Sequence, residues 1–189
     1  MKLLDNNMFR LIQAATISRR VRSADTERFD ALRVLETWVP YRDAGFELFV
    51  IDDSDWHGEP DEDAYINFDR STKLFFRQSV YDAALNGDPS CQFTCAHELA
   101  HLELHAKIAR SKLSREPHKK IAHRTNPKQE MEANVYAGAL QIPFPALRKD
   151  STTWELRLQY RVSQEVAQKA LDQYNYLTRK GFSFEFRKV

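Results

Sequence analysis

Three stretches of the chain repeat their apolar residues every three or four positions, which is the period of an α-helix. The first predicts an amphipathic helix over residues 3–20. The second predicts a helix over about 25–38, which Pro40 should end because proline lacks the N–H that a helix needs. The third predicts one long helix over 153–179, closed by Gly181.

Other apolar runs are shorter and rich in β-branched and aromatic residues, which favours strands. Three such runs occupy 46–51, 64–68 and 73–78, and the last two flank a turn at 69–72 that predicts a hairpin. The tail 182–187 alternates apolar and polar residues and predicts a final strand. Together these elements predict an α+β fold in which a small antiparallel or mixed sheet packs on helices.

Length and composition are those of one globular domain. We expect a single domain over 1–189, with a helical region at 1–45, a core at 46–148 and a C-terminal helix and strand at 149–189. Apolar residues make up 42% and charged residues 29% of the chain, and its net charge of +1 argues against a dedicated nucleic-acid binder.

Nothing in the chain suggests a membrane or a secreted protein. No apolar stretch approaches the ~20 residues that span a bilayer, and polar residues interrupt the N-terminal segment too early for a secretory signal. Cysteine occurs only at Cys91 and Cys95. A disulfide between them would be strained in a helix, so we expect a reducing, cytoplasmic setting, with Cys95 as a small core residue.

A further helix is expected from Ser90 to Ala106, because Asp88 and Pro89 form a typical helix start and neither glycine nor proline follows within it. One stripe of this helix is apolar. Another is polar and consists of Thr94, His97, His101 and His105. A helix with stacked histidines on one side is typical of the wall of a cleft.

The polar stripe contains the pattern HExxH, from His97 to His101. Residues four apart lie on the same face of a helix, so these two histidines can converge on one metal ion while Glu98 handles the proton of a water molecule. This is the arrangement of zinc hydrolases that cleave peptide bonds. His105 lies ~12 Å along the helix from His97, too far to complete the same site. We expect it to orient a ligand or to pack.

Zinc (Zn2+) in a catalytic site needs a third protein ligand, and the helix expected over 127–143 offers two carboxylates. Glu130 and Asn134 share a face with small residues, which would let the two helices approach closely. Glu132 lies about 200° around the helix from Glu130, so both cannot point at one metal. We choose Glu130 as the ligand and Asn134 as a group that orients a ligand, with Glu132 as the alternative.

These two helices resemble the ImmA/IrrE family of metallopeptidases, which in turn is similar to the gluzincins. The likeness is carried by Phe93-Thr-Cys-Ala-His-Glu-Leu-Ala-His101 with the trailing His105, by Glu130-x-x-Ala133-Asn134-x-x-Ala137, and by Leu140-Gln-Ile-Pro143. Ala100 stands where the family usually has glycine, and Tyr136 stands where it usually has phenylalanine. Neither departure touches a ligand.

The resemblance implies a zincin-like core with N- and C-terminal helices, and zinc held by His97, His101 and Glu130. It also implies a regulatory endopeptidase of bacterial or phage origin. Its substrate would be a helix-turn-helix repressor of the XRE type, encoded nearby. One alternative is a non-catalytic regulator that binds a partner or DNA, because residues 160–171 echo half of a helix-turn-helix unit, although no preceding helix or turn glycine is evident. Another is a toxin–antitoxin component.

Two loops carry opposite charge. Residues 52–63 contain seven acids and no Lys or Arg, and resemble a calcium loop only faintly. Residues 107–128 contain eight Lys and Arg against a single acid, Glu116. We expect a solvated loop, with a recognition surface for an acidic substrate or a regulatory lid as the alternatives.

Peptide hydrolysis also needs a donor that stabilises the oxyanion. The candidates are Tyr65, Tyr81, His57 and His123. Strand 73–78 is expected to offer its edge to an extended substrate. Specificity would then come from the basic loop, the N-terminal helices and the strand at 182–187.

Overall fold

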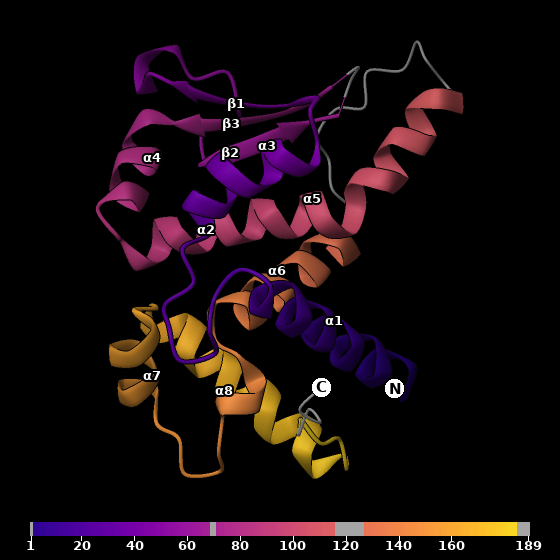
Figure 1. The fold of residues 1–189 in the computed structure, drawn as a ribbon, viewed down its shortest axis with the longest axis vertical. Helices are drawn as coiled ribbons and strands as arrows, with labels where there is room; N and C mark the ends of the chain where they lie inside the picture. The colour runs from indigo at the N-terminus through magenta and orange to yellow at the C-terminus, as the bar shows by residue number, and fades with distance from the viewer. Residues whose placement is uncertain (1, 69–70, 116–126, 185–189) are drawn as a thin grey trace. The chain divides into compact units, whose positions relative to one another are not determined.

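The computed structural model describes residues 2–68, 71–115 and 127–184 of the 189-residue chain (Figure 1). The chain divides into two compact units. One comprises Asp30–Ala133 and the other comprises Met1–Phe29 together with Asn134–Val189. Helix α6 (Pro127–Gln141) carries residues of both. The expectation of a single domain stays a prediction.

The unit Asp30–Ala133 contains a three-stranded mixed sheet formed by β1 (Phe46–Ile51), β2 (Ala64–Asn67) and β3 (Thr72–Arg77). Their order is β1-β3-β2, with β1 parallel and β2 antiparallel to β3. All three strands lie within a residue of the ranges that the sequence predicts, and the hairpin is confirmed, although its tip at 69–70 lies outside the described residues. The expected free edge at 73–78 is wrong, because β3 is the central strand and pairs on both sides.

Aromatic side chains fix the register of this sheet. Phe75 on β3 is the cross-strand neighbour of both Phe49 and Tyr65, and its ring stacks on theirs with centroid distances of 5.0 and 4.7 Å. On the opposite face, Leu74 and Ile66 face each other and are buried. A slip of one residue would exchange the two faces, so burial and stacking select the same register.

Helix α5 (Pro89–Arg115) runs along the buried face of the sheet (Figure 1). It begins where the sequence predicts, because Asp88 Oδ1 accepts hydrogen bonds from the backbone N–H groups of Ser90 and Cys91, both at 2.9 Å. Cys95 and Leu99 lie in the core, with no exposed surface. The apolar stripe therefore anchors the helix and leaves the histidine stripe on another side.

Helix α4 (Gln78–Leu85) follows β3 directly and was not expected from the sequence. Its first turn is capped by Asp53, whose Oδ1 accepts a hydrogen bond from the Ser79 N–H at 3.0 Å. The capping residue lies 26 positions earlier in the chain, so no local capping signal marks this helix.

The helix expected over 25–38 is corrected at both ends. It begins with α2 (Ala31–Arg33), because Asp30 accepts a hydrogen bond from the Arg33 N–H. It continues through a π-helical segment, Val34–Trp38, into α3 (Val39–Arg42), so Pro40 does not end it. Proline is tolerated in the first turn of a helix, and the wider π-helical turn before it accommodates the change in hydrogen bonding.

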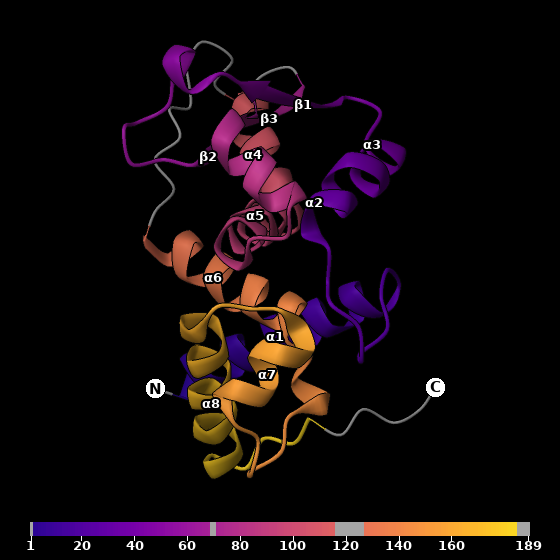
Figure 2. The same cartoon turned by 90° about the vertical axis from the view of Figure 1, so that its left-hand side faces the viewer.

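The other unit contains α1 (Lys2–Arg20), which confirms the helix expected over 3–20. The long helix expected over 153–179 is wrong, because two helices, α7 (Thr153–Tyr160) and α8 (Gln164–Arg179), pack against each other there (Figure 2). Arg161 ends α7 in a left-handed conformation with φ of 52°. Ser163 then caps α8 by accepting a hydrogen bond from the Val166 N–H.

Gly181 follows α8 with φ of 86°, as expected for a helix-closing glycine. The final strand is not formed in its described part, because residues 182–184 adopt no regular structure. Phe184 is buried there, with its ring centroid 5.2 Å from that of Phe144 and 5.4 Å from that of Phe9. Contacts with helix side chains thus replace strand pairing, and residues 185–187 lie outside the described ranges.

Arg19 is buried within this unit and its guanidinium binds backbone carbonyl groups from two directions. It donates to Leu140 and Gln141 at the C-terminal end of α6, and to Ala24 and Glu27 in the segment after α1. The last carbonyl groups of a helix have no partners within it, so Arg19 satisfies groups that would otherwise be buried unpaired.

The fold is α+β, with a small mixed sheet and helices, as the sequence predicts. Among the described residues, no helix has both the length and the apolar character that crossing a bilayer requires.

Candidate metal centre

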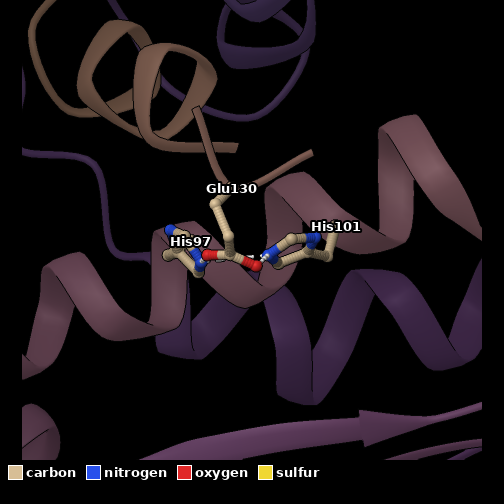
Figure 3. Close-up of side chains that lie close together, drawn as sticks. All are labelled: His97, His101 and Glu130. Atoms are coloured by element: carbon tan, nitrogen blue, oxygen red, sulfur yellow. Dashed lines mark hydrogen bonds and ion pairs between the residues drawn. The ribbon is translucent and has the colours of Figure 1, made fainter. Parts of the chain in front are cut away.

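Helix α5 brings His97 and His101 together (Figure 3). Their Nε2 atoms lie 2.9 Å apart and their ring centroids 4.6 Å apart. The side chains of His97 and His101 are 17% and 7% exposed, so both rings are largely buried. Spacing by four residues on an uninterrupted helix produces this arrangement directly.

The carboxylate of Glu130, in the first turn of α6, reaches both histidines (Figure 3). Its Oε2 lies 3.1 Å from His97 Nε2, and its Oε1 lies 3.4 Å from His101 Nε2. Two imidazole nitrogens and one carboxylate therefore face one another, although they come from two different helices, α5 and α6.

These three groups suit a zinc ion. Ligands of a tetrahedral zinc ion lie about 3.4 Å apart, given metal–ligand distances of about 2.0–2.1 Å. The three donor–donor distances here are 2.9, 3.1 and 3.4 Å, and one ligand atom from each residue falls within 4.8 Å of the others. Among the described residues, His97, His101 and Glu130 form the cluster able to hold a metal ion.

Glu98 follows the first histidine and is buried, with 7% of its surface exposed. Its pKa is raised to about 7, mainly by burial, with the charge of His97 acting in the opposite direction and the charges of Glu130 and Glu62 adding to the effect of burial. A carboxyl group with such a pKa exchanges protons close to neutral pH, which suits a general acid or base.

His105 and Glu132 form a second pair beside this cluster. His105 is buried, and its Nε2 lies 3.2 Å from Glu132 Oε2. The other ring nitrogen, Nδ1, lies 3.1 Å from Nδ1 of His101. Glu130 and Glu132 therefore contact different histidines, in keeping with their ~200° separation around the helix.

Asn134 lies on α6 four residues after Glu130, and its side chain is exposed. Its expected role in orienting a ligand stays a prediction.

The candidate oxyanion donors have different surroundings. The Tyr81 hydroxyl donates a hydrogen bond to Glu36, which raises the pKa of Tyr81 to about 12. Tyr65 lies in the aromatic layer of the sheet, with its ring against Trp56 and Phe75. His57 is exposed in the acidic loop, and His123 lies outside the described residues.

Arg77 organises the acidic loop and was not singled out from the sequence. It donates hydrogen bonds to the backbone carbonyls of Glu59, Pro60 and Glu62, and its guanidinium lies 5.1 Å from the centre of the Trp56 ring. In the sequence, this role is marked by nothing more than a single arginine near the end of the predicted strand 73–78. Among the described residues, no acidic cluster in this loop has the geometry of a metal site.

The expected loop over 107–128 is wrong for residues 107–115, because they are helical and extend α5 beyond its expected end at Ala106. Residues 116–126 lie outside the described part of the chain, and the expected role of the basic stretch in recognition stays a prediction.

The family model of the IrrE N-terminal-like domain, Peptidase_M78, matches residues 60–172, which is more than half of the chain and includes α5 and α6. Neither a curated protein nor a solved structure gives a significant match. The chain therefore belongs to the family of IrrE N-terminal-like domains, a family of metallopeptidases.

Proposed function

We propose that this protein is a zinc-dependent endopeptidase that cleaves a cognate regulatory protein. The observation that carries the proposal is the cluster of His97, His101 and Glu130, with the buried Glu98 next to it in the sequence. Two imidazoles and a carboxylate leave one position of a tetrahedral ion open, which is the pattern of catalytic rather than structural zinc.

The chemistry follows from these groups. A zinc ion held there supplies Lewis-acid chemistry: it makes water acidic enough to lose a proton near neutral pH and polarises a carbonyl group. Glu98, as a carboxylate, accepts the proton of the attacking water at one of its oxygens. It then delivers this proton to the nitrogen of the departing amine, which would otherwise leave as an unstable anion.

The proposed substrate is an XRE-type helix-turn-helix repressor encoded near this protein, as the resemblance to the ImmA/IrrE family implies. The proposed setting is a bacterial or phage-encoded system in the cytoplasm, and both cysteines are free thiols in keeping with it. An extended substrate segment could pair with an edge strand of the sheet, and the edges are β1 and β2.

Zinc removal tests the proposal. Purified protein stripped with a chelator should not cleave the neighbouring repressor, and restoring one equivalent of zinc should restore cleavage. Magnesium at the same concentration serves as a control, because it prefers octahedral oxygen ligands. Cleavage that persists in the stripped protein would contradict a zinc mechanism.

One observation favours a second candidate, a non-catalytic regulator that binds DNA or a protein. Helix α7 supplies the preceding helix that the sequence did not reveal, and Arg161 takes the left-handed conformation of the missing turn glycine. The exposed residues of α8 are of mixed charge, however: Gln164, Glu165, Gln168, Lys169, Asp172, Asn175 and Arg179. Binding that needs α8 but not Glu98 would favour this candidate, or a toxin–antitoxin role, over the enzyme.

A further inference from the structure

A continuous line of polar contacts leads from the candidate metal cluster to a carboxylate outside it. His101 contacts His105 through their Nδ1 atoms at 3.1 Å, and His105 contacts Glu132 through Nε2 at 3.2 Å. The side chains of His105 and Glu132 are 6% and 16% exposed, so solvent competes little for these contacts.

The protons along this line can be assigned. A neutral imidazole carries one proton, on one of its two nitrogens. His101 turns Nε2 toward His97 and Glu130, so a metal ion would take the lone pair of that nitrogen and leave the proton on Nδ1. This N–H then donates to Nδ1 of His105. The proton of His105 must therefore be on Nε2, from which it donates to Glu132.

We propose that His105 and Glu132 are positioning residues of the metal centre, which fix the tautomer and the ring orientation of His101. This inference rests on the proposed zinc site. A metal-ligating histidine usually donates its second N–H to a carboxylate or a carbonyl group. Here His105 lies between the metal-binding His101 and the carboxylate of Glu132. The carboxylate therefore acts on His101 through the hydrogen bonds of His105.

A purely structural role for Glu132 would rest on an ion pair within its own helix. Lys128 lies 3.7 Å from Glu132 on the same helix, but its side chain is 72% exposed. Exposed ion pairs of this kind contribute little. The contact of Glu132 with the buried His105 is therefore the contact that affects the metal site.

Zinc affinity measures the effect without any need for catalysis. In competition with a chromogenic chelator, Glu132→Gln and His105→Phe should each weaken zinc binding about 10–100-fold, while one zinc still binds at saturation. Glu103→Gln is the matched control. It removes the same charge from an exposed residue two positions from His101, and should leave the affinity within about twofold.

The double variant separates a relay from a general charge effect. If Glu132 acts through His105, Glu132→Gln should add nothing to the loss caused by His105→Phe. If the two losses of zinc affinity multiplied in the double variant, the inference would be overturned. An unchanged zinc affinity in Glu132→Gln would also overturn it.

Nitrogen NMR of the zinc-loaded wild-type protein tests the same point without substitutions. It should find the proton on Nδ1 of His101 and on Nε2 of His105, and the opposite tautomer of His105 would overturn the relay. Zinc affinities that follow this pattern in a protein that cleaves nothing would leave the relay standing and contradict the proposed function. A wild-type chain that binds no zinc would contradict both.

Discussion

Glu130 and Glu132 lie two residues apart on α6 and contact different histidines. The Glu130 carboxylate lies 3.1 Å from His97, and the Glu132 carboxylate lies 3.2 Å from His105. Two histidines about two turns apart on α5 thus meet two carboxylates of one helix. The pair provides matched substitutions that remove the same charge from nearly the same place.

The first prediction uses this pair. Purified wild-type protein should contain about one zinc per chain, and Glu130→Ala should lose it because the site then keeps only two ligands. Glu132→Ala should still bind one zinc when zinc is in excess, because its carboxylate contacts His105 rather than the cluster. Metal analysis by mass spectrometry provides the measurement. The ligand assignment would be wrong if the Glu132 variant lost zinc and the Glu130 variant kept it.

The second prediction concerns Arg19. Arg19→Met should lower the free energy of unfolding by roughly 3 kcal/mol, because buried carbonyl groups at the end of α6 lose their donor. Arg20→Met is the control. Arg20 pairs with Asp25 at 2.6 Å but is 40% exposed, so its loss should cost less than about 1 kcal/mol. Urea unfolding of the metal-free protein measures both, and equal losses would contradict the structural role given to Arg19.

The third prediction concerns the break between α7 and α8. Arg161→Gly should raise the free energy of unfolding by about 1 kcal/mol, because glycine adopts the left-handed conformation without steric cost. Gln159→Gly, two residues earlier and inside α7, should instead lower it by about 1 kcal/mol. Thermal melting of both variants compares them. If both glycines were destabilising, residues 153–179 would more closely resemble the single helix that the sequence predicts.

The fourth prediction is that zinc-loaded protein digests casein poorly. A regulatory protease must spare most proteins around it, and pairing with a strand edge selects no sequence. Specificity must then come from peripheral elements, among which we place the N-terminal helices, the basic stretch 107–128 and the C-terminal tail. Rapid digestion of casein by the wild type, absent from Glu98→Gln, would show that such restraint does not exist.

Local patterns were enough to predict the elements that carry the site. Helix α5 was predicted because Asp88 and Pro89 start it and nothing breaks it, and the histidine spacing needs only helical geometry. The same helical geometry predicts that Glu130 and Glu132 point in different directions, and the two carboxylates do contact different histidines. The sheet strands were predicted because each is a short apolar run between polar turns.

The predictions from sequence fail where distant residues or an unusual backbone conformation determine the local structure. Helix α4 is capped by Asp53, which lies 26 residues before its partner in the chain. The break at Arg161 uses a non-glycine residue with positive φ, so no glycine or proline marked it. The contacts of Arg19 with residues more than 100 positions away cannot be read from a local pattern.

We propose that Glu98 is the general base of hydrolysis at the zinc site. Glu98→Gln preserves the size of the side chain but cannot accept the proton of water, so the variant should fold, bind one zinc and cleave at least ~10²-fold more slowly. The direct measurement is the rate of repressor cleavage by wild type and Glu98→Gln at equal zinc content, followed on gels. We predict rapid cleavage by the wild type and almost none by the variant, whereas equal rates would contradict the hydrolytic mechanism.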